Sequence, residues 1–139
     1  MSEDGVPIKY DSAGRGSPAL VFIHGWAGDR SFWDNQSAYF SRRYQVVRVD
    51  LAGHGESGLG RKVYSIPAFG ADVAAVVEKL GLKQVILIGH SLGGPVALEA
   101  EKRLGNRVIG VVAVDIFHSK FVVPSDKMTE IIIKPFRDD

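Results

Sequence analysis

Short apolar runs alternate along this chain with segments in which apolar residues recur every three or four positions. The runs are rich in branched aliphatic residues, which is typical of parallel strands buried on both faces. They predict strands at 7–10, 19–24, 45–50, 84–89 and 107–115, and the segments between them predict helices at 31–42, 67–80 and 92–104. Strands that alternate with helices favour an α/β fold, a three-layer αβα sandwich around a mostly parallel, right-handed sheet.

The helix predicted at 67–80 has signals at both of its ends. Ser65 can cap its first turn, Pro67 suits a first-turn position, and Gly81 can end it. Its apolar residues fall on one face at helical spacing, and we interpret that face as core rather than as a ligand site. They are Phe69, Val73, Val76, Val77 and Leu80.

Composition sets broad limits on the class of protein. The chain has 139 residues, of which 45% are hydrophobic and 24% charged, and its formal net charge is +1, so we expect one soluble domain spanning 1–139. No basic face calls for a nucleic-acid partner. Without cysteine, disulfides and thiolate metal sites are excluded. No apolar run approaches the roughly 18 residues of a membrane span, and no leader is apparent, so a cytoplasmic location is the default expectation.

The most informative segment runs from the strand at 84–89 through Ser91 into the helix that follows. A sharp strand-to-helix turn brings neighbouring backbones together and strains the central residue, so small residues are needed two positions before and after it. Gly89 and Gly93 meet that need around Ser91. The amide of Leu92 and the positive end of the helix would then face an anion formed at the serine.

Two other strands end in segments suited to the same site. The strand at 19–24 ends in His24-Gly25, so the amide of Trp26 is the natural second donor to an oxyanion. The strand at 45–50 ends in Asp50 and opens into a glycine-rich loop at 51–58. Ligands of open α/β sheets bind at this edge, where the carboxyl ends of the strands meet.

Together these segments resemble successive signatures of the α/β-hydrolase superfamily, and of its esterase, lipase and lactonase-like branch in particular. The resemblance covers about 5–117 and is carried by His24-Gly25-Trp26, by the run from Asp50 to Ser57, and by Gly89-His90-Ser91-Leu92-Gly93-Gly94. It implies that Ser91 is the nucleophile, that the amides of Trp26 and Leu92 form the oxyanion hole, and that Gly25 belongs to the substrate-binding loop. Relatives with an aspartate nucleophile are disfavoured because the turn carries serine.

The reaction implied is acyl transfer on a small-molecule ester or lactone, without a cofactor or metal. Some members of the superfamily take the acid of the catalytic triad from the end of the sixth strand, and Asp115 ends the corresponding strand here. Asp115 is therefore the candidate acid. An aspartate with a structural role is also common at this position, so both interpretations stay open.

The superfamily usually has more than 200 residues, eight strands and an inserted cap. We therefore expect an α/β-hydrolase fold truncated to about five strands, with 118–139 as the start of the cap region. The superfamily's base is a histidine after the eighth strand, and nothing here matches that position. The leading hypothesis is the amino-terminal portion of a serine hydrolase that lacks the triad histidine. The alternatives are a non-catalytic binding module or inactive fragment, and a minimal hydrolase whose base is His118 or His54.

The remaining polar candidates at this edge are expected to support the loops rather than to react. We expect His24 to brace the oxyanion loop, His90 to point away from Ser91, His54 to hydrogen-bond within its loop, and Asp50 to brace that loop rather than bind a metal. Three aromatic residues after the strand at 19–24 are candidates either for an acyl pocket or for the core. They are Trp26, Phe32 and Trp33.

The last segment predicts a short capped helix at 125–134, stopped by Pro135. Its apolar residues, Met128, Ile131, Ile132 and Phe136, need a cover. That cover is the cap of a complete enzyme, a partner subunit or a swapped element, so self-association through this tail is one expected outcome.

Overall fold

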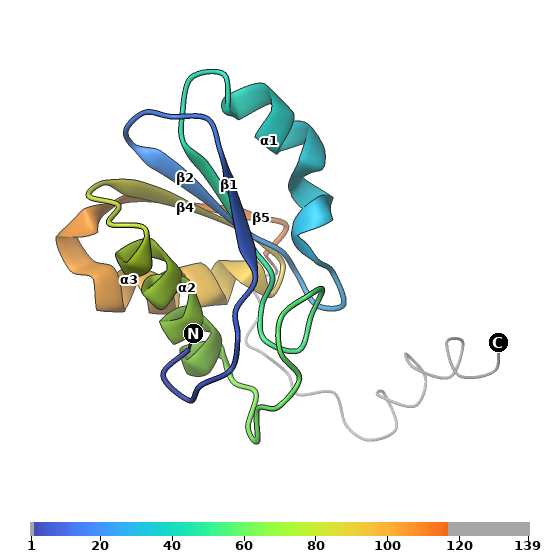
Figure 1. The fold of residues 1–139 in the computed structure, drawn as a ribbon. Helices are drawn as coiled ribbons and strands as arrows, with labels where there is room; N and C mark the ends of the chain where they lie inside the picture. Colours follow the sequence, from blue (N-terminus) through green and yellow to red (C-terminus); the bar gives the residue numbers. More distant parts are fainter. Residues whose placement is uncertain (1, 117–139) are drawn as a thin grey trace, which may run out of the picture.

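Five strands form one twisted sheet in the order β1-β3-β2-β4-β5 in the computed structural model, which describes residues 2–116 (Figure 1). The β1–β3 pair is antiparallel, and the other three neighbouring pairs are parallel. The strands are β1 (Tyr10–Ala13), β2 (Ala19–Ile23), β3 (Val46–Val49), β4 (Val85–His90) and β5 (Val108–Val114). The carboxyl ends of β2, β3, β4 and β5 therefore meet at one edge.

Helices cover both faces of the sheet, and the predicted three-layer αβα arrangement is confirmed. Figure 1 shows α1 on one side of the sheet and α2 with α3 on the other. The α-helices are α1 (Asp34–Phe40), α2 (Ile66–Lys79) and α3 (Gly93–Leu104), and the 3-10 turns are η1 (Arg30–Trp33) and η2 (Gly105–Arg107). None of the helices in the described part of the chain has the length and apolar character needed to span a membrane.

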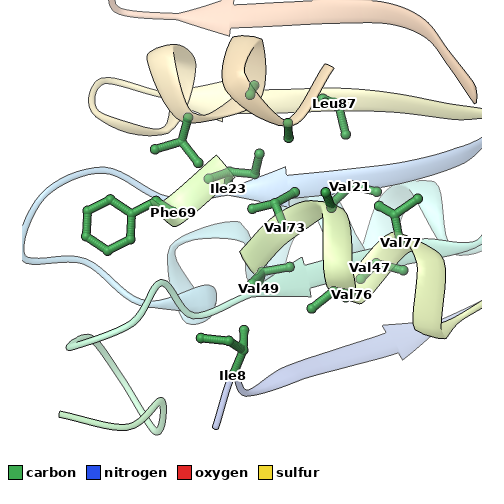
Figure 2. Close-up of a cluster of buried hydrophobic side chains, with 14 of the residues drawn as sticks. Ile8, Val21, Ile23, Val47, Val49, Phe69, Val73, Val76, Val77 and Leu87 are labelled. Atoms are coloured by element: carbon green, nitrogen blue, oxygen red, sulfur yellow. The ribbon is translucent and has the colours of Figure 1, made fainter. Parts of the chain in front are cut away.

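The alternation of side chains along the strands divides the core into two clusters. In the larger cluster, α2 and α3 pack on one face of the sheet, where Figure 2 shows Phe69 and Val73 of α2 near Val21 and Ile23 of β2. In the smaller cluster, Phe22 packs against Trp33 of η1 on the opposite face. Residues of opposite parity on β2 thus serve the two faces, as the geometry of a strand requires.

The signals read at the ends of α2 are confirmed. The Ser65 hydroxyl accepts a hydrogen bond from the Ala68 amide at 3.3 Å, Pro67 lies in the first turn, and Gly81 has a left-handed φ of +65° just after the helix. The predicted apolar stripe is buried, with Leu80 partly so.

The strand predicted at 7–10 is wrong by three residues, because β1 begins at Tyr10. Residues 7–9 instead pair with the loop after β3: the Lys9 carbonyl accepts from the Asp50 amide at 2.9 Å, and the Pro7 carbonyl accepts from the Gly58 amide at 2.8 Å. Ile8 is buried in the larger cluster, so the apolar signal came from core packing and not from a sheet ladder. The short helix predicted at 125–134, its apolar tail and His118 lie outside the described residues.

A buried ion pair joins the start of the chain to α2. The Arg61 guanidinium donates to both oxygens of Asp72 at 2.7 and 2.8 Å, and to both oxygens of Asp4 at 2.8 and 2.9 Å. Burial raises the pKa of Asp72, and Arg61 opposes that shift. Because Asp72 is almost fully buried, removing Arg61 would leave the Asp72 carboxylate as an uncompensated buried charge.

Gly70 gives a test of how closely α2 and α3 pack. A Cβ on Gly70 would lie 2.5 Å from the Glu99 Cβ and 3.0 Å from the Ala100 amide nitrogen of α3. An exposed helical Gly→Ala change usually stabilises by about 0.5–1 kcal/mol. We expect Gly70→Ala instead to destabilise the fold by about 1–3 kcal/mol, because the two helix backbones must separate.

Urea unfolding measures this effect. Gly60→Ala is the control, because a Cβ there has no atom within 4 Å, and it is expected to leave the free energy of unfolding unchanged or slightly raised. A Gly70→Ala protein as stable as the parent would contradict the tight contact between α2 and α3.

Candidate active site

Ser91 occupies a sharp turn between β4 and α3, with a φ of +50° in the left-handed region. Such a conformation costs a non-glycine residue on the order of 1–3 kcal/mol. The glycines around it have no room for a side chain: a Cβ on Gly89 would overlap the Gly93 carbonyl, and one on Gly93 would overlap the Ile23 carbonyl at the end of β2. The steric need for glycine that the sequence suggested is therefore present in the structure.

Strained residues are grouped at the same edge of the sheet. Within residues 2–116, three non-glycine residues have a positive φ: Ala27 at +56°, Ser91 at +50° and Asp115 at +54°. They follow β2, β4 and β5, which are consecutive neighbours in the sheet. Strain of this kind persists where the surrounding structure holds it in place, and it often occurs at functional sites.

The loop after β2 lies directly against Ser91. A Cβ placed on Gly25 would be 3.1 Å from the Ser91 Cβ and 3.0 Å from Nδ1 of His90. The neighbouring amides of Trp26 and Leu92 donate to no protein acceptor within residues 2–116. Leu92 also immediately precedes the first residue of α3, where the helix dipole favours negative charge. Two free amides therefore belong to the two segments that meet at Ser91.

His24 is fully buried and uses both ring nitrogens. Its Nδ1 donates to the Gly25 carbonyl at 2.7 Å, and its Nε2 accepts from the Leu51 amide at 3.0 Å. This pattern requires a neutral ring, and burial lowers the pKa of His24 accordingly. The imidazole thus ties the Gly25 loop to the loop after β3, in agreement with the supporting role expected of it.

Asp50 is also fully buried and ties the same two loops together. Its carboxylate accepts from the Arg30 amide at 2.7 Å and from the Glu56 amide at 3.0 Å. The Arg30 guanidinium pairs with both Asp50 and Glu56. All of these partners are protein groups, so Asp50 braces the loop as expected.

The His90 side chain contacts Phe32 of η1 and lies near the Gly25 loop. Its ring stacks on Phe32, with centroids 4.6 Å apart and an interplanar angle of 23°. Its Nε2 lies 3.9 Å from an oxygen of Asp115, whose side chain is 72% exposed. The structure therefore brings Asp115 beside His90.

The other aromatic candidates separate into core and surface. Trp33 is buried against Phe22, at a centroid distance of 4.9 Å, so it belongs to the core. Trp26 is 75% exposed and meets the His54 ring edge-on at 5.6 Å. His54 Nδ1 donates to the Ala52 carbonyl at 3.1 Å, as expected of a residue that hydrogen-bonds within its loop.

A family comparison identifies the fold. The model of the alpha/beta hydrolase fold family matches residues 18–136. The chain belongs to the α/β-hydrolase family. This match includes the loops after β2 and β3 and the turn at Ser91.

The proteins to which this α/β hydrolase is similar are named for several activities. It is 39% identical over 94 residues to a non-heme haloperoxidase from Rhodococcus erythropolis. The aligned region covers 67% of this chain and 34% of that protein. It is 39% identical over 95 residues to a bifunctional esterase/perhydrolase from Acinetobacter calcoaceticus, again covering 67% and 34%. The chain thus spans about a third of the length of these curated relatives.

A comparison with a solved structure shows the same partial match. The α/β hydrolase matches Est816, described as an N-acyl homoserine lactone degrading enzyme, with a TM-score of 0.79 and 33% identity. The match covers 84% of this chain and 44% of that one. The relationship therefore includes most of this chain and less than half of that enzyme.

A polar cavity of about 390 Å³ lies beside Asp50, and the residues of the turn at Ser91 are not among those that line it. Among its lining residues are Asp11, Asp29, Arg30, Arg48 and Glu56. Arg30 and Arg48 already pair with carboxylates there. We therefore assign the cavity to the bracing network and not to the candidate site.

Two features of the site escaped the sequence analysis. Arg30 was not recognised as the partner of Asp50, and the stack of Phe32 on His90 was not foreseen. No pattern in the sequence pairs residues that lie 20 or more positions apart on different loops. A charged residue and an aromatic residue within η1, Arg30 and Phe32, were the available signals.

His24 predicts a pH dependence of stability. The pKa of His24 is lower in the folded than in the unfolded chain. At pH values between these two pKa values, the unfolded state therefore binds more protons than the folded state. The stabilisation from His24 is complete above the unfolded pKa of about 6.5 and is lost as pH falls through the lower folded pKa. His24→Ala should cost about 1–3 kcal/mol at pH 7.5 by leaving the Leu51 amide unpaired.

Urea unfolding at pH 7.5, 6.5 and 5.5 tests this. The difference in free energy of unfolding between the parent and His24→Ala should shrink toward pH 5.5. His54→Ala, with its partly exposed ring, serves as the control histidine. A difference that is the same at all three pH values would contradict the neutral, doubly bonded imidazole.

Proposed function

We propose that this chain carries the nucleophile and oxyanion hole of a serine hydrolase that acts on carboxylic esters or lactones. Ser91 is the nucleophile, and the amides of Trp26 and Leu92 bind the oxyanion. The observation that carries the proposal is the left-handed Ser91 packed against Gly25, with the amides of Trp26 and Leu92 beside them and without a protein acceptor among residues 2–116.

The mechanism follows from these positions. Ser91 Oγ attacks the carbonyl carbon, a base takes the hydroxyl proton, and the Trp26 and Leu92 amides stabilise the charge that develops on the carbonyl oxygen. Collapse of the tetrahedral intermediate expels the alcohol and leaves an acyl-enzyme, which water then hydrolyses. An oxyanion donor of this kind typically contributes about 2.7–4 kcal/mol to the rate.

The base is assigned to none of the three described histidines. His24 is held at both ring nitrogens, His90 points to Phe32 and Asp115, and His54 bonds its own loop. The proposal therefore takes the base from an imidazole outside residues 2–116. Asp115 is its candidate acid partner, since its carboxylate is mostly exposed at the same edge.

The substrate class rests on the names of relatives as well as on the site. An esterase/perhydrolase and a lactone-degrading enzyme are among the proteins that this chain resembles. Both names describe reactions at an acyl carbon, which fits a nucleophilic serine beside two amides. Esters and lactones share this electrophilic carbon, so one site serves both.

Labelling with a fluorophosphonate tests the nucleophile in the chain as it stands. Ser91 Oγ forms a bond to phosphorus, fluoride leaves, and the hydroxyl proton passes to the buffer. We expect slow labelling at Ser91, made at least about tenfold faster by added imidazole that stands in for the base. Mass spectrometry of the digested protein locates the adduct.

Two serine variants define the outcome. Ser91→Ala should abolish the adduct, and Ser31→Ala, an exposed serine in the neighbouring turn, should leave it unchanged. A folded parent without any adduct in imidazole would contradict the proposal and favour a non-catalytic binding module. Rapid labelling without imidazole would show that the base lies within these 139 residues.

Gly25 offers a second test, aimed at the oxyanion loop. Gly25→Ala places a Cβ about 3 Å from Ser91 and His90, so the loop must retreat and the Trp26 amide moves with it. We expect labelling in imidazole to slow by about tenfold, which corresponds to roughly 1.4 kcal/mol. Gly28→Ala, whose Cβ has only ordinary contacts of 3.4 Å or more, is the matched control. Equal rates for both variants would place the oxyanion donor elsewhere.

A further inference from the structure

Two large aromatic side chains are exposed in the loop that packs against Ser91. Trp26 is 75% exposed and Phe32 is 52% exposed. They have different neighbours: Trp26 meets His54 of the loop after β3, whereas Phe32 stacks on His90, the residue before Ser91. Phe32 is thus the exposed ring that stacks on the side chain of the residue before Ser91.

Defined contacts hold the segment around Phe32 in place, although its ring is half exposed. Its turn is capped by Asp29, whose carboxylate accepts from the Ser31 amide at 2.7 Å, and Arg30 is paired with the buried Asp50. One side of its ring lies on His90, and Trp33 meets it edge-on at 5.0 Å. The fold therefore holds a half-exposed ring in a defined position.

His90 connects the position of the Phe32 ring to that of Ser91. The His90 Nδ1 and the Ser91 Cβ both lie about 3 Å from a Cβ built on Gly25. The stacked pair of rings therefore lies next to the junction of Gly25 with Ser91. In the proposed site, a substrate bound at Ser91 would therefore lie near the exposed part of Phe32.

We propose that Phe32, stacked on His90, is a specificity-determining residue that selects substrates with a planar aryl group adjoining the reacting carbonyl. An aryl group can pack on the exposed part of the Phe32 ring, which already stacks on His90 and meets Trp33 edge-on. A linear alkyl group gains less from the same surface. This inference rests on the proposed function, because it takes Ser91 as the reacting residue.

Boronic acids test the inference without requiring turnover. Ser91 Oγ bonds to boron, the hydroxyl proton passes to the buffer, boron becomes tetrahedral, and no group leaves. Dissociation constants are measured by NMR for phenylboronic acid and butylboronic acid on the full chain. We expect phenylboronic acid to bind about three- to tenfold more tightly, the range that aromatic pairs typically provide.

Variants of Phe32 decide the result. Phe32→Leu should bring the two dissociation constants within about twofold of each other, while Phe32→Tyr, which retains the ring, should keep the preference. Tyr39→Leu removes an exposed ring on α1 and should change nothing. Unfolding curves establish that each variant is folded, and the tyrosine variant keeps the test decisive if the leucine variant is unstable.

The outcomes separate the two proposals. Binding of both probes that persists in Ser91→Ala would contradict the proposed function. Binding that depends on Ser91 but shows no preference for the phenyl probe would overturn the specificity inference and leave the nucleophile in place. A preference that is unchanged in Phe32→Leu would overturn it as well.

Discussion

Close contact between backbones at the start of α3 determines the rest of the site. Gly93 lies against the Ile23 carbonyl at the end of β2, and Gly89 lies against Gly93 itself. No side chain fits between these segments, so α3 begins at the sheet edge and Ser91 is forced into a left-handed conformation. Because β2 and β4 are neighbours, the same contact brings the Gly25 loop against Ser91. The left-handed turn at Ser91 and its contact with the Gly25 loop thus have one steric origin.

Two buried polar side chains hold the loops around that contact. His24 joins the Gly25 carbonyl to the Leu51 amide, and Asp50 joins the amides of Arg30 and Glu56. The Leu51 amide that His24 satisfies is buried, and leaving such a group without a partner would cost about 1–3 kcal/mol. The loops after β2 and β3 therefore behave as one braced unit. Phe32 lies in the same turn as Arg30, which pairs with Asp50. Its half-exposed ring is therefore attached to this unit and held in place by it.

Features that depend on local chemistry could be predicted from the sequence, and features that depend on distant partners could not. The cap of α2 at Ser65, the parallel strands and the glycines around Ser91 each follow from short patterns, and they were found. The position of β1 was missed because Ile8 is apolar for a reason unrelated to the sheet: it packs in the core while its neighbours pair with the loop after β3. Arg30 with Asp50, and Phe32 with His90, were missed because each pair forms only once the loops are folded together.

Strain is concentrated where the chemistry is proposed to occur, and the packing explains how the fold sustains it. Ala27, Ser91 and Asp115 each hold a conformation that costs on the order of 1–3 kcal/mol. They follow three adjacent strands, two of which, β2 and β4, have fully buried branched residues such as Val21 and Leu87 at their centres. The Ser91 amide also donates to the Val114 carbonyl at 2.9 Å, so the turn is bonded to β5 as well as wedged against β2. A change in the backbone of Ser91 would therefore disturb both the end of β5, next to Asp115, and the loop after β2.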